Sequence, residues 1–401
     1  MNLHRSSGRT LHSRMDCRGS ILLASTCTTT NQVHMPNDNR MGWIRNLEAL
    51  AGSGEQYAAE YELGSECYIP GLLDYADGQI VCVLLSTEKS RSKLWLYNLT
   101  LRFPLGPHDH IARIREADAK GYYFKDGILG ELLALMSLFF RCRFYLISSR
   151  IMLKNPRLGM GLKMEYPVVR EECDPGIHPP VFQDTGRNLA VGFKEFLDRV
   201  KTLDQGLHQA FVLACYHYRR AINEIGVDPE MVFIRLVSAI EVLSKNQTLT
   251  SKDDALEERG IANLIAQSRL PFEQKHELQT IFDVRKSRKR FIRFIEQHCS
   301  GFFRGGNFQG SLKIRRADLR KVLNNIYDAR SRYLHAGEPM YLSRPMRGGE
   351  KWDAEPSLGM IADNRKFRGS QKLPYAHFLE GLVRHSLLNY LKANSSHGSK
   401  D

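Results

Sequence analysis

One segment, residues 230–244, constrains the fold more than any other because it is apolar on nearly every side of a helix. A helix of this kind has to be surrounded by other helices. Gly226 ends the preceding helical pattern, and Pro229 occupies an early helical position, where its fixed φ favours initiation. Glu241 is the only acidic residue between 231 and 244, so we expect its side chain to be largely buried. The apolar residues of this segment are Met231, Val232, Phe233, Ile234, Leu236, Val237, Ala239, Ile240, Val242 and Leu243.

Other segments with a helical spacing of apolar residues flank this central helix along the chain. Apolar residues at intervals of three and four predict helices over 203–225, 256–270, 272–299, 317–335 and 375–391. The region 201–395 is therefore expected to form an all-α helical bundle. The polar residues 396–401 are expected to form a disordered tail.

The preceding region, residues 45–200, has strand patterns instead. Several runs are apolar or alternate between apolar and polar residues, and residues 130–140 form one buried helix. This region is expected to be an N-terminal mixed α/β domain with antiparallel strands, which places the whole chain in the α+β class. The Gly- and Pro-rich stretch 156–180 predicts a long loop. The predicted strands cover 58–63, 78–86, 94–103 and 143–152.

The remaining bulk features point to a protein without a membrane partner. Residues 1–44 are rich in Ser, Thr, Asn and Arg, have no periodic pattern and are expected to be disordered. No apolar run has the length of a membrane span, and the apolar patch 21–24 is too short for a secretory signal. The eight cysteines form no Cys-x2-Cys pair, which argues against a zinc ribbon and favours reduced thiols. We therefore expect a cytoplasmic protein.

Neither a metal nor another cofactor is expected. The sequence contains no phosphate loop, dinucleotide fingerprint or nucleophile elbow. His108, Asp109 and His110 follow a Pro- and Gly-rich stretch and have no partner cluster nearby, so we interpret them as a solvated loop and not as a ligand set.

The charge balance points to a polyanionic partner, and nucleic acid is the simplest one. The chain of 401 residues has a formal net charge of +13, and much of this charge lies between residues 285 and 321. A solvated helix face is the alternative interpretation of such a run. The predicted RNA-contacting residues are Arg285, Lys286, Arg288, Lys289, Arg290, Arg293, Arg315 and Arg316.

Arg330 interrupts the apolar face of the helix predicted at 317–335. A guanidinium on a core-facing stripe is costly unless it is paired or lines a cleft, and Glu241 is the candidate partner. His335 lies in the last turn, before the helix stop at Gly337, where the helix dipole favours the charged imidazole and acid–base chemistry is effective near neutral pH. Asp328 and Ser331 flank the pair and are candidates for hydrogen bonds to a substrate or to each other.

The motif Tyr-x2-Arg-Ser-x3-His-x-Gly, which begins at Tyr327, resembles the signature of the HEPN superfamily and its Apea-like subgroup in particular. The segments 236–243 and 290–295 add to this resemblance, which covers residues 200–395. It implies a helical HEPN domain and a metal-independent ribonuclease site made of Arg330 and His335. It also implies a two-fold homodimer with helix 317–335 near the interface.

The resemblance further implies an endoribonuclease in which the RNA 2′-hydroxyl attacks its own phosphorus. His335 is then the acid–base group, Arg330 binds the phosphate oxygens, and Glu241 supports Arg330. Such proteins act as toxin-like or antiviral defence effectors in prokaryotes, and the N-terminal domain is expected to sense a protein or small-molecule trigger. Two alternatives stay open. One is a non-catalytic HEPN protein that binds RNA or acts as a scaffold, with Arg330 and His335 structural. The other is an interaction protein whose N-terminal domain recognises a partner.

Overall fold

A computed structural model describes most of the chain from residue 42 onward. The described residues belong to one compact unit, which spans residues 39–401. Residues 1–41 and 396–401, which were expected to be disordered, and the sequence His108-Asp109-His110 lie outside the described residues. The described ranges are 42–51, 56–85, 90, 94–104, 127–152, 163–165, 186–225, 227–245, 260–261, 263–303, 313–340, 342, 353 and 373–395.

The N-terminal part is built on an antiparallel sheet. In the described residues this sheet has six strands in the order β2-β3-β4-β1-β5-β6, and every neighbouring pair is antiparallel. Strand β1 is central and pairs with β4 on one side and β5 on the other. The expectation of an α+β chain with antiparallel strands is thereby confirmed. The strands are β1 (Gln56–Ser65), β2 (Leu72–Tyr75), β3 (Ile80–Leu84), β4 (Trp95–Pro104), β5 (Tyr145–Met152) and β6 (Lys163–Glu165).

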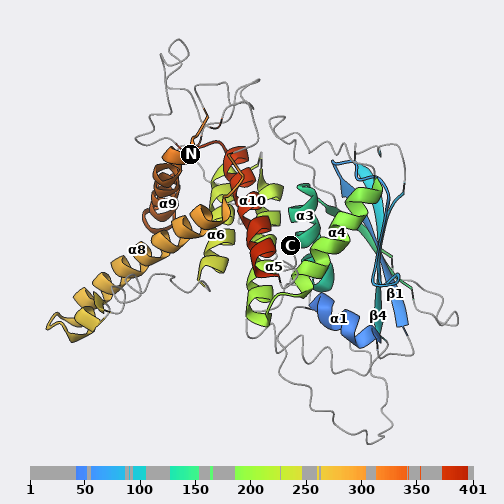
Figure 1. Cartoon of the computed structure of the whole chain (residues 1–401), viewed down its shortest axis with the longest axis horizontal. Coiled ribbons are helices and arrows are strands. Elements are labelled where there is room, and N and C mark those ends of the chain that lie inside the picture. The colour runs from blue at the N-terminus through green and yellow to red at the C-terminus, as the bar shows by residue number, and fades with distance from the viewer. Residues whose placement is uncertain are drawn as a thin grey trace, which may run out of the picture. The chain divides into compact units, whose positions relative to one another are not determined.

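Three helices accompany the sheet: α1 (Gly42–Ala51), α3 (Gly127–Phe140) and α4 (Gly186–Lys201). Helix α1 contacts β4 and α3, and α4 contacts β2. Figure 1 shows these helices beside the sheet. Helix α3 is apolar almost throughout and buries nearly all of its residues, as its sequence predicts.

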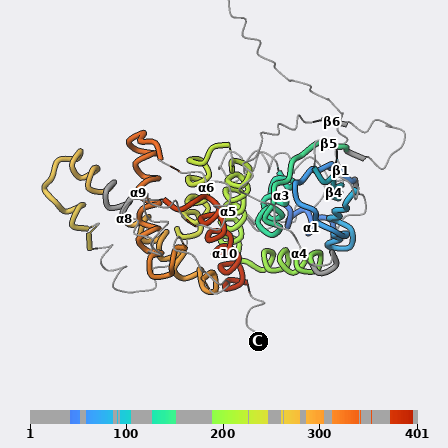
Figure 2. The backbone as a smooth tube through the Cα atoms, turned by 90° about the horizontal axis from the view of Figure 1, so that it is seen from above, coloured from blue at the N-terminus to red at the C-terminus, as the bar shows by residue number. Residues whose placement is uncertain are grey.

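The described residues after β6 form helices. Helix α6 contacts α5, α8, α9 and α10, so the central position predicted for residues 230–244 is confirmed (Figures 1 and 2). Its start follows the sequence signals, because Asp228 caps the helix by accepting a hydrogen bond from the Met231 N–H and Pro229 occupies the first turn. The helices are α5 (Gln205–Glu224), α6 (Pro229–Ser244), α8 (Phe272–His298), α9 (Leu319–Ala336) and α10 (Ala376–Asn394).

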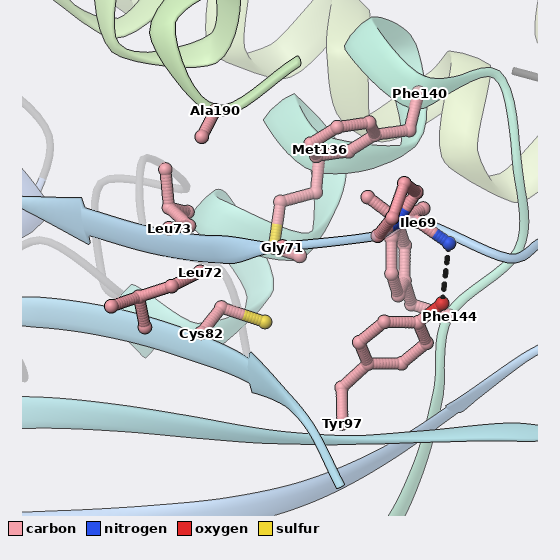
Figure 3. Close-up of a pocket in the computed structure, with 11 residues that line it drawn as sticks. Ile69, Gly71, Leu72, Leu73, Cys82, Tyr97, Met136, Phe140, Phe144 and Ala190 are labelled. Carbon is pink, nitrogen blue, oxygen red and sulfur yellow. Dashed lines mark hydrogen bonds between the residues drawn. The ribbon is translucent and has the colours of Figure 1, made fainter. Parts of the chain in front are cut away.

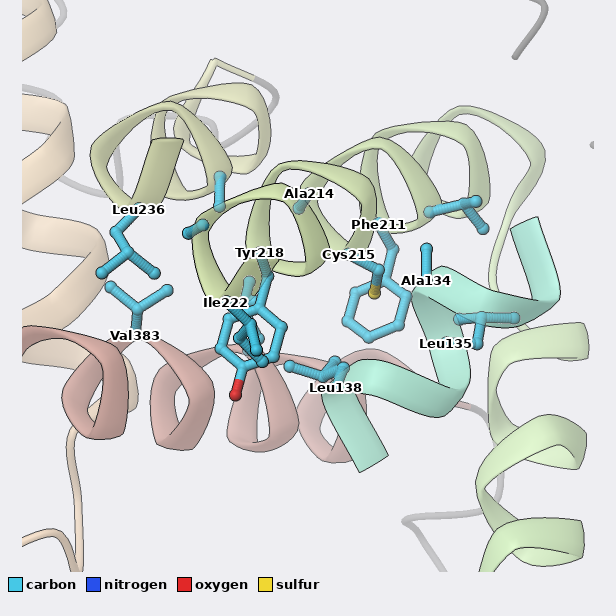
Figure 4. Close-up of a cluster of buried hydrophobic side chains, with 14 of the residues drawn as sticks. Ala134, Leu135, Leu138, Phe211, Ala214, Cys215, Tyr218, Ile222, Leu236 and Val383 are labelled. Carbon is cyan, nitrogen blue, oxygen red and sulfur yellow. The ribbon is translucent and has the colours of Figure 1, made fainter. Parts of the chain in front are cut away.

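The hydrophobic core is continuous across residue 200, where the sequence predicts a domain boundary. Helices α3 and α5 contact each other along their buried faces, and Figure 4 shows side chains of α3, α5, α6 and α10 gathered in one cluster. The sheet part and the helical part are therefore joined by apolar packing. The labelled members of this cluster are Ala134, Leu135, Leu138, Phe211, Ala214, Cys215, Tyr218, Ile222, Leu236 and Val383.

Two arginines reinforce this junction with polar contacts. Arg384 on α10 donates from Nε to the Leu138 carbonyl at 2.8 Å and from Nη2 to the Phe139 carbonyl at 2.6 Å. These carbonyls belong to the last turn of α3 and have no partner within that helix. Arg141, which follows α3, donates from Nε to both carboxylate oxygens of Glu380 at 3.0 Å.

The structure corrects the sequence prediction at several places. Residues 42–44 are not disordered, because α1 begins at Gly42 and buries Trp43 and Ile44. Strand β6 lies inside the stretch 156–180 that predicts a loop, and neither β2 nor α4 is predicted. Residues 263–267 are helical within the helix predicted at 256–270. Among the described residues, no helix combines the length and the apolar character that crossing a membrane requires.

Candidate functional site

Helix α9 positions the two residues that the sequence singles out. A 3-10 turn at Arg316–Asp318 leads into it, and Gly337 ends it with a left-handed φ of 66°. Its buried face carries Leu319, Val322, Leu323, Ile326 and Tyr327, the apolar stripe seen in the sequence.

Arg330 forms the ion pair predicted from the sequence. Its Nη2 atom lies 2.6 Å from Glu241 Oε2, and the two side chains are 17% and 15% exposed. Tyr327 donates its hydroxyl hydrogen to the other oxygen, Oε1 of Glu241, at 2.9 Å. Both oxygens of this carboxylate therefore have partners on α9, and Glu241 fixes the Arg330 guanidinium.

The ring of Tyr327 lies next to two guanidinium groups. The Cζ atoms of Arg330 and Arg288 are 5.6 and 5.9 Å from the ring centre, within the range of cation–π attraction. Burial raises the pKa of Tyr327 well above its usual range, and the negative charge of Glu241 raises it further, while Arg330 opposes the shift. Tyr327 is therefore a neutral hydroxyl donor at physiological pH.

The two arginines each retain an unused donor. The Nε atoms of Arg330 and Arg288 are buried, and neither has a hydrogen-bond partner among the described residues. Arg288 instead uses Nη2 to pair with Asp328. The structure thus places Asp328 against Arg288, and Ser331 is half-buried one position after Arg330.

His335 lies at the exposed end of α9. Its side chain has no hydrogen-bond or ion-pair partner in the described part of the chain. It lies five positions after Arg330, which corresponds to about 7.5 Å along the helix axis and about 140° around it. The Arg330 guanidinium faces α6, so a single copy of the chain does not bring the two side chains into contact.

The predicted RNA-contacting residues differ in their exposure. Lys289, Arg315 and Arg316 are exposed, whereas Lys286, Arg288, Arg290 and Arg293 are partly buried, and the side chain of Arg285 lies outside the described residues. Some basic groups of this region are neutralised by acids. Arg288 pairs with Asp328, Lys313 with Asp353 at 2.9 Å, and Arg320 with Glu296 at 2.8 Å. The sequence interval 285–321 includes neither Asp328 nor Asp353, so it overstates the free positive charge of this surface.

A second candidate site is a pocket between the sheet and α3. Its cavity volume is only about 30 Å³, and apolar side chains line most of it. Figure 3 shows Tyr97, Phe140 and Phe144 around it, with the Tyr97 hydroxyl engaged by the Ile69 N–H at 2.8 Å. This pocket has no group of convergent charges that would support chemistry. In the described ranges, His, Cys, Asp and Glu residues also do not gather in groups of three or more that could hold a metal ion.

Comparison with known proteins identifies no relative of this chain. A scan against protein-family models and searches of the curated proteins and of the solved structures found no match to this chain.

Sequence reasoning finds the pair of Arg330 and Glu241 but misses the residues that complete the cluster. Tyr327 precedes Arg330 by three positions, which places both on one helix face, so this signal was available. The approach of Arg288 depends on how α8 packs against α9, and no sequence pattern reveals it.

Proposed function

We propose that the protein is a metal-independent endoribonuclease of the Apea-like HEPN type, with residues 201–395 as its HEPN domain. The observation that carries this proposal is the position of Arg330, which Glu241 and Tyr327 hold at the side of α9. A guanidinium fixed in this way is oriented before substrate arrives, which is what a transition-state contact requires. Arginine also keeps its proton at working pH and matches two phosphate oxygens.

The proposed reaction breaks one phosphodiester bond. The 2′-hydroxyl oxygen of the RNA attacks the adjacent phosphorus, and the bond from phosphorus to the 5′-oxygen breaks. A base removes the 2′-hydroxyl proton and an acid protonates the departing 5′-oxygen, which leaves a 2′,3′-cyclic phosphate and a 5′-hydroxyl. His335 supplies acid–base catalysis, worth about 10²–10⁴-fold, and Arg330 stabilises the charge on phosphorus.

A second copy of the chain is part of the proposal. Arg330 and His335 point to different sides of α9, so two copies related by a two-fold axis give a simple way to combine an Arg330 with a His335 at one phosphate. Leu334 supports an interface at this end of α9, because it is 47% exposed next to His335.

We also propose a division of labour along the chain. Residues 45–200 act as the sensor for a protein or small-molecule trigger, and the protein acts as a prokaryotic defence or toxin-like effector in the cytoplasm. The contacts of Arg384 with the last turn of α3 support this idea, since they tie the sheet part to the helical part.

A non-catalytic RNA-binding protein is the second candidate. Glu241 neutralises the charge of Arg330 and both side chains are mostly buried, which also suits a purely structural ion pair. In that case the exposed residues Lys289, Arg315 and Arg316 bind phosphates, and RNA affinity falls steeply with salt.

The deciding experiment is RNA cleavage in EDTA by the full chain. We expect products with 2′,3′-cyclic ends, and a loss of at least 100-fold in Arg330→Ala and His335→Ala. Arg332→Ala is the matched control, because Arg332 lies on the same helix, is 63% exposed and pairs only loosely with Glu338 at 3.6 Å. If the full-length parent and all variants bind RNA equally well and none cleaves it, the RNA-binding alternative replaces the nuclease.

A further inference from the structure

Cys67 and Cys142 are far apart in the sequence and meet at one end of the ladder between β1 and β5. The last pairs of this ladder are Leu63 with Leu146 and Gly64 with Tyr145. If the same register continues, Ser65 faces Phe144, Glu66 faces Arg143, and Cys67 faces Cys142. Opposed residues of antiparallel strands have Cα atoms about 4.5–5.5 Å apart, which lies inside the range that a disulfide requires.

Side-chain contacts show that the two chain segments stay side by side beyond the last ladder pair. Glu66 Oε2 lies 3.9 Å from Arg143 Nε, as expected for two residues that face each other. The hydroxyl of Tyr145 also reaches Glu66, at 3.3 Å. The next residues along the two segments are Cys67 and Cys142, and the proximity of Cys67 adds to the raised pKa of the Cys142 thiol.

The alternation of the strands places both thiols on the core side. Side chains two positions apart share a face of the sheet, and Leu63, Ser65 and Cys67 are all buried. Phe144 and Cys142 are buried in the segment that leads into β5. The backbone at Cys67 is fixed as well, because its carbonyl accepts a hydrogen bond from the Tyr97 hydroxyl at 2.8 Å and its N–H donates to Ser65 Oγ at 3.2 Å.

From this geometry we propose that Cys67 and Cys142 form a reversible disulfide when the protein meets a small disulfide oxidant of the glutathione type. One thiolate attacks the oxidant and releases one small thiol. The second thiolate then attacks the resulting mixed disulfide and releases the second small thiol. The two cysteines lose two protons and two electrons, and the oxidant is reduced to two thiols.

Burial sets the rate of this exchange. Cys67 and Cys142 are 2% and 3% exposed, and burial raises the pKa of the Cys142 thiol. A thiolate therefore forms only when this end of the ladder opens locally. We expect oxidation over hours in the folded state, and faster oxidation in urea below the unfolding transition.

The neighbouring Cys82 supplies the matched control. It is also buried, on β3, and burial raises its pKa to about 12. Of the described cysteines, Cys67 and not Cys82 acts on the thiol of Cys142. Removing Cys82 should therefore leave the disulfide intact.

The test uses the full chain equilibrated with oxidised and reduced glutathione at pH 8, with and without sub-denaturing urea. Free thiols are alkylated after acid quenching, and non-reduced peptides are mapped by mass spectrometry. The expected result is a linked peptide joining Cys67 to Cys142 that has lost two hydrogen atoms. It should disappear in Cys67→Ser and Cys142→Ser, persist in Cys82→Ser, and revert with dithiothreitol, and the oxidised protein should have a higher Tm. The proposal is overturned if Cys67 and Cys142 stay fully alkylatable in both conditions, or if either one links to Cys82.

Discussion

Arg141 and Glu380 form an ion pair although they lie 239 positions apart in the sequence, with the Nε of Arg141 3.0 Å from both carboxylate oxygens. Glu380 is 4% exposed and also accepts a hydrogen bond from Tyr218. The carboxylate is thus buried at the junction between α3, α5 and α10. Its charge is tolerated there because its partners surround it.

Replacing Arg141 should destabilise the protein strongly. Arg141→Ala leaves the buried Glu380 carboxylate without its cation, which costs about 3 kcal/mol of unfolding free energy. Urea unfolding measures this loss. Arg320→Ala is the control, because the Arg320–Glu296 pair has similar geometry at 2.8 Å but its Glu296 side chain is 33% exposed, against 5% for Glu380. Arg320→Ala should lower the unfolding free energy by less than about 1 kcal/mol. Equal losses in the two variants would contradict the claim that burial makes the Arg141–Glu380 pair the more important one.

Glu131 should make stability depend on pH. Its carboxylate accepts the Gly42 and Trp43 N–H groups at the start of α1, both at 3.0 Å, yet burial raises its pKa to about 7. An acid whose pKa is raised in the folded state binds its proton more tightly in the folded than in the unfolded protein. The stabilisation that this proton binding gives is fully present below about pH 4.5 and is lost as the pH rises through about 7.

The comparison is with Glu131→Gln, which cannot ionise. Relative to this variant, the parent should lose about 3 kcal/mol of unfolding free energy between pH 4.5 and pH 8. Urea titrations across this interval give the difference. A difference between the two proteins that stays constant with pH would show that Glu131 does not titrate in this range.

Tyr327 and Glu241 should be energetically coupled. Tyr327→Phe removes the hydroxyl that donates to the Glu241 carboxylate and leaves the ring between the two arginines. A hydrogen bond to a charged acceptor contributes about 1.5–3 kcal/mol. A double-mutant cycle with Glu241→Gln should therefore give a coupling of at least about 1 kcal/mol, whereas additive effects would mean that the contact contributes nothing.

Gly64 should tolerate no side chain. A Cβ atom there would lie 2.8 Å from Leu94 Cδ1 and 3.1 Å from Ile147 Cδ1. Leu94 is completely buried, so Gly64→Ala should cost about 1–3 kcal/mol through overpacking. Gly206→Ala is the control, since nothing lies within 4 Å of its Cβ position, and it should be neutral or stabilising in thermal unfolding.

Periodicity predicts the long elements of this fold well. The helices α5, α6, α8, α9 and α10 begin and end within a few residues of the predicted ranges, because their apolar stripes and their Gly or Pro boundaries are local signals. The short strand β2 lacks such signals, whereas the helix α4 was missed although Leu189, Phe193, Phe196, Leu197 and Val200 follow a helical spacing. Tertiary packing determines β2, but α4 is a strongly one-sided helix whose pattern was available in the sequence.

The sequence predicts a contact of the candidate site only where an unpaired charge would be energetically costly and therefore requires a partner. An arginine on an apolar stripe requires an acid, and Glu241 was the acid available in the central helix, so their contact could be predicted. The approach of Arg288, the pairing of Lys313 with Asp353 and the meeting of Cys67 with Cys142 depend on packing and strand register. These relations join distant parts of the chain, and composition and spacing do not encode them. The catalytic roles of Arg330 and His335 remain predictions.

The contacts of Arg384 also affect how the protein is made. A ribosome releases α3 long before it reaches residue 384, so the Leu138 and Phe139 carbonyls must stay hydrated until Arg384 has been synthesised. The carbonyls at the end of α3 gain their hydrogen bonds from Arg384 only when α10 emerges from the ribosome and packs against α3. The sheet part is therefore completed by a helix that is synthesised long after α3, and a nascent chain that stalls before α10 should still be recognised by chaperones.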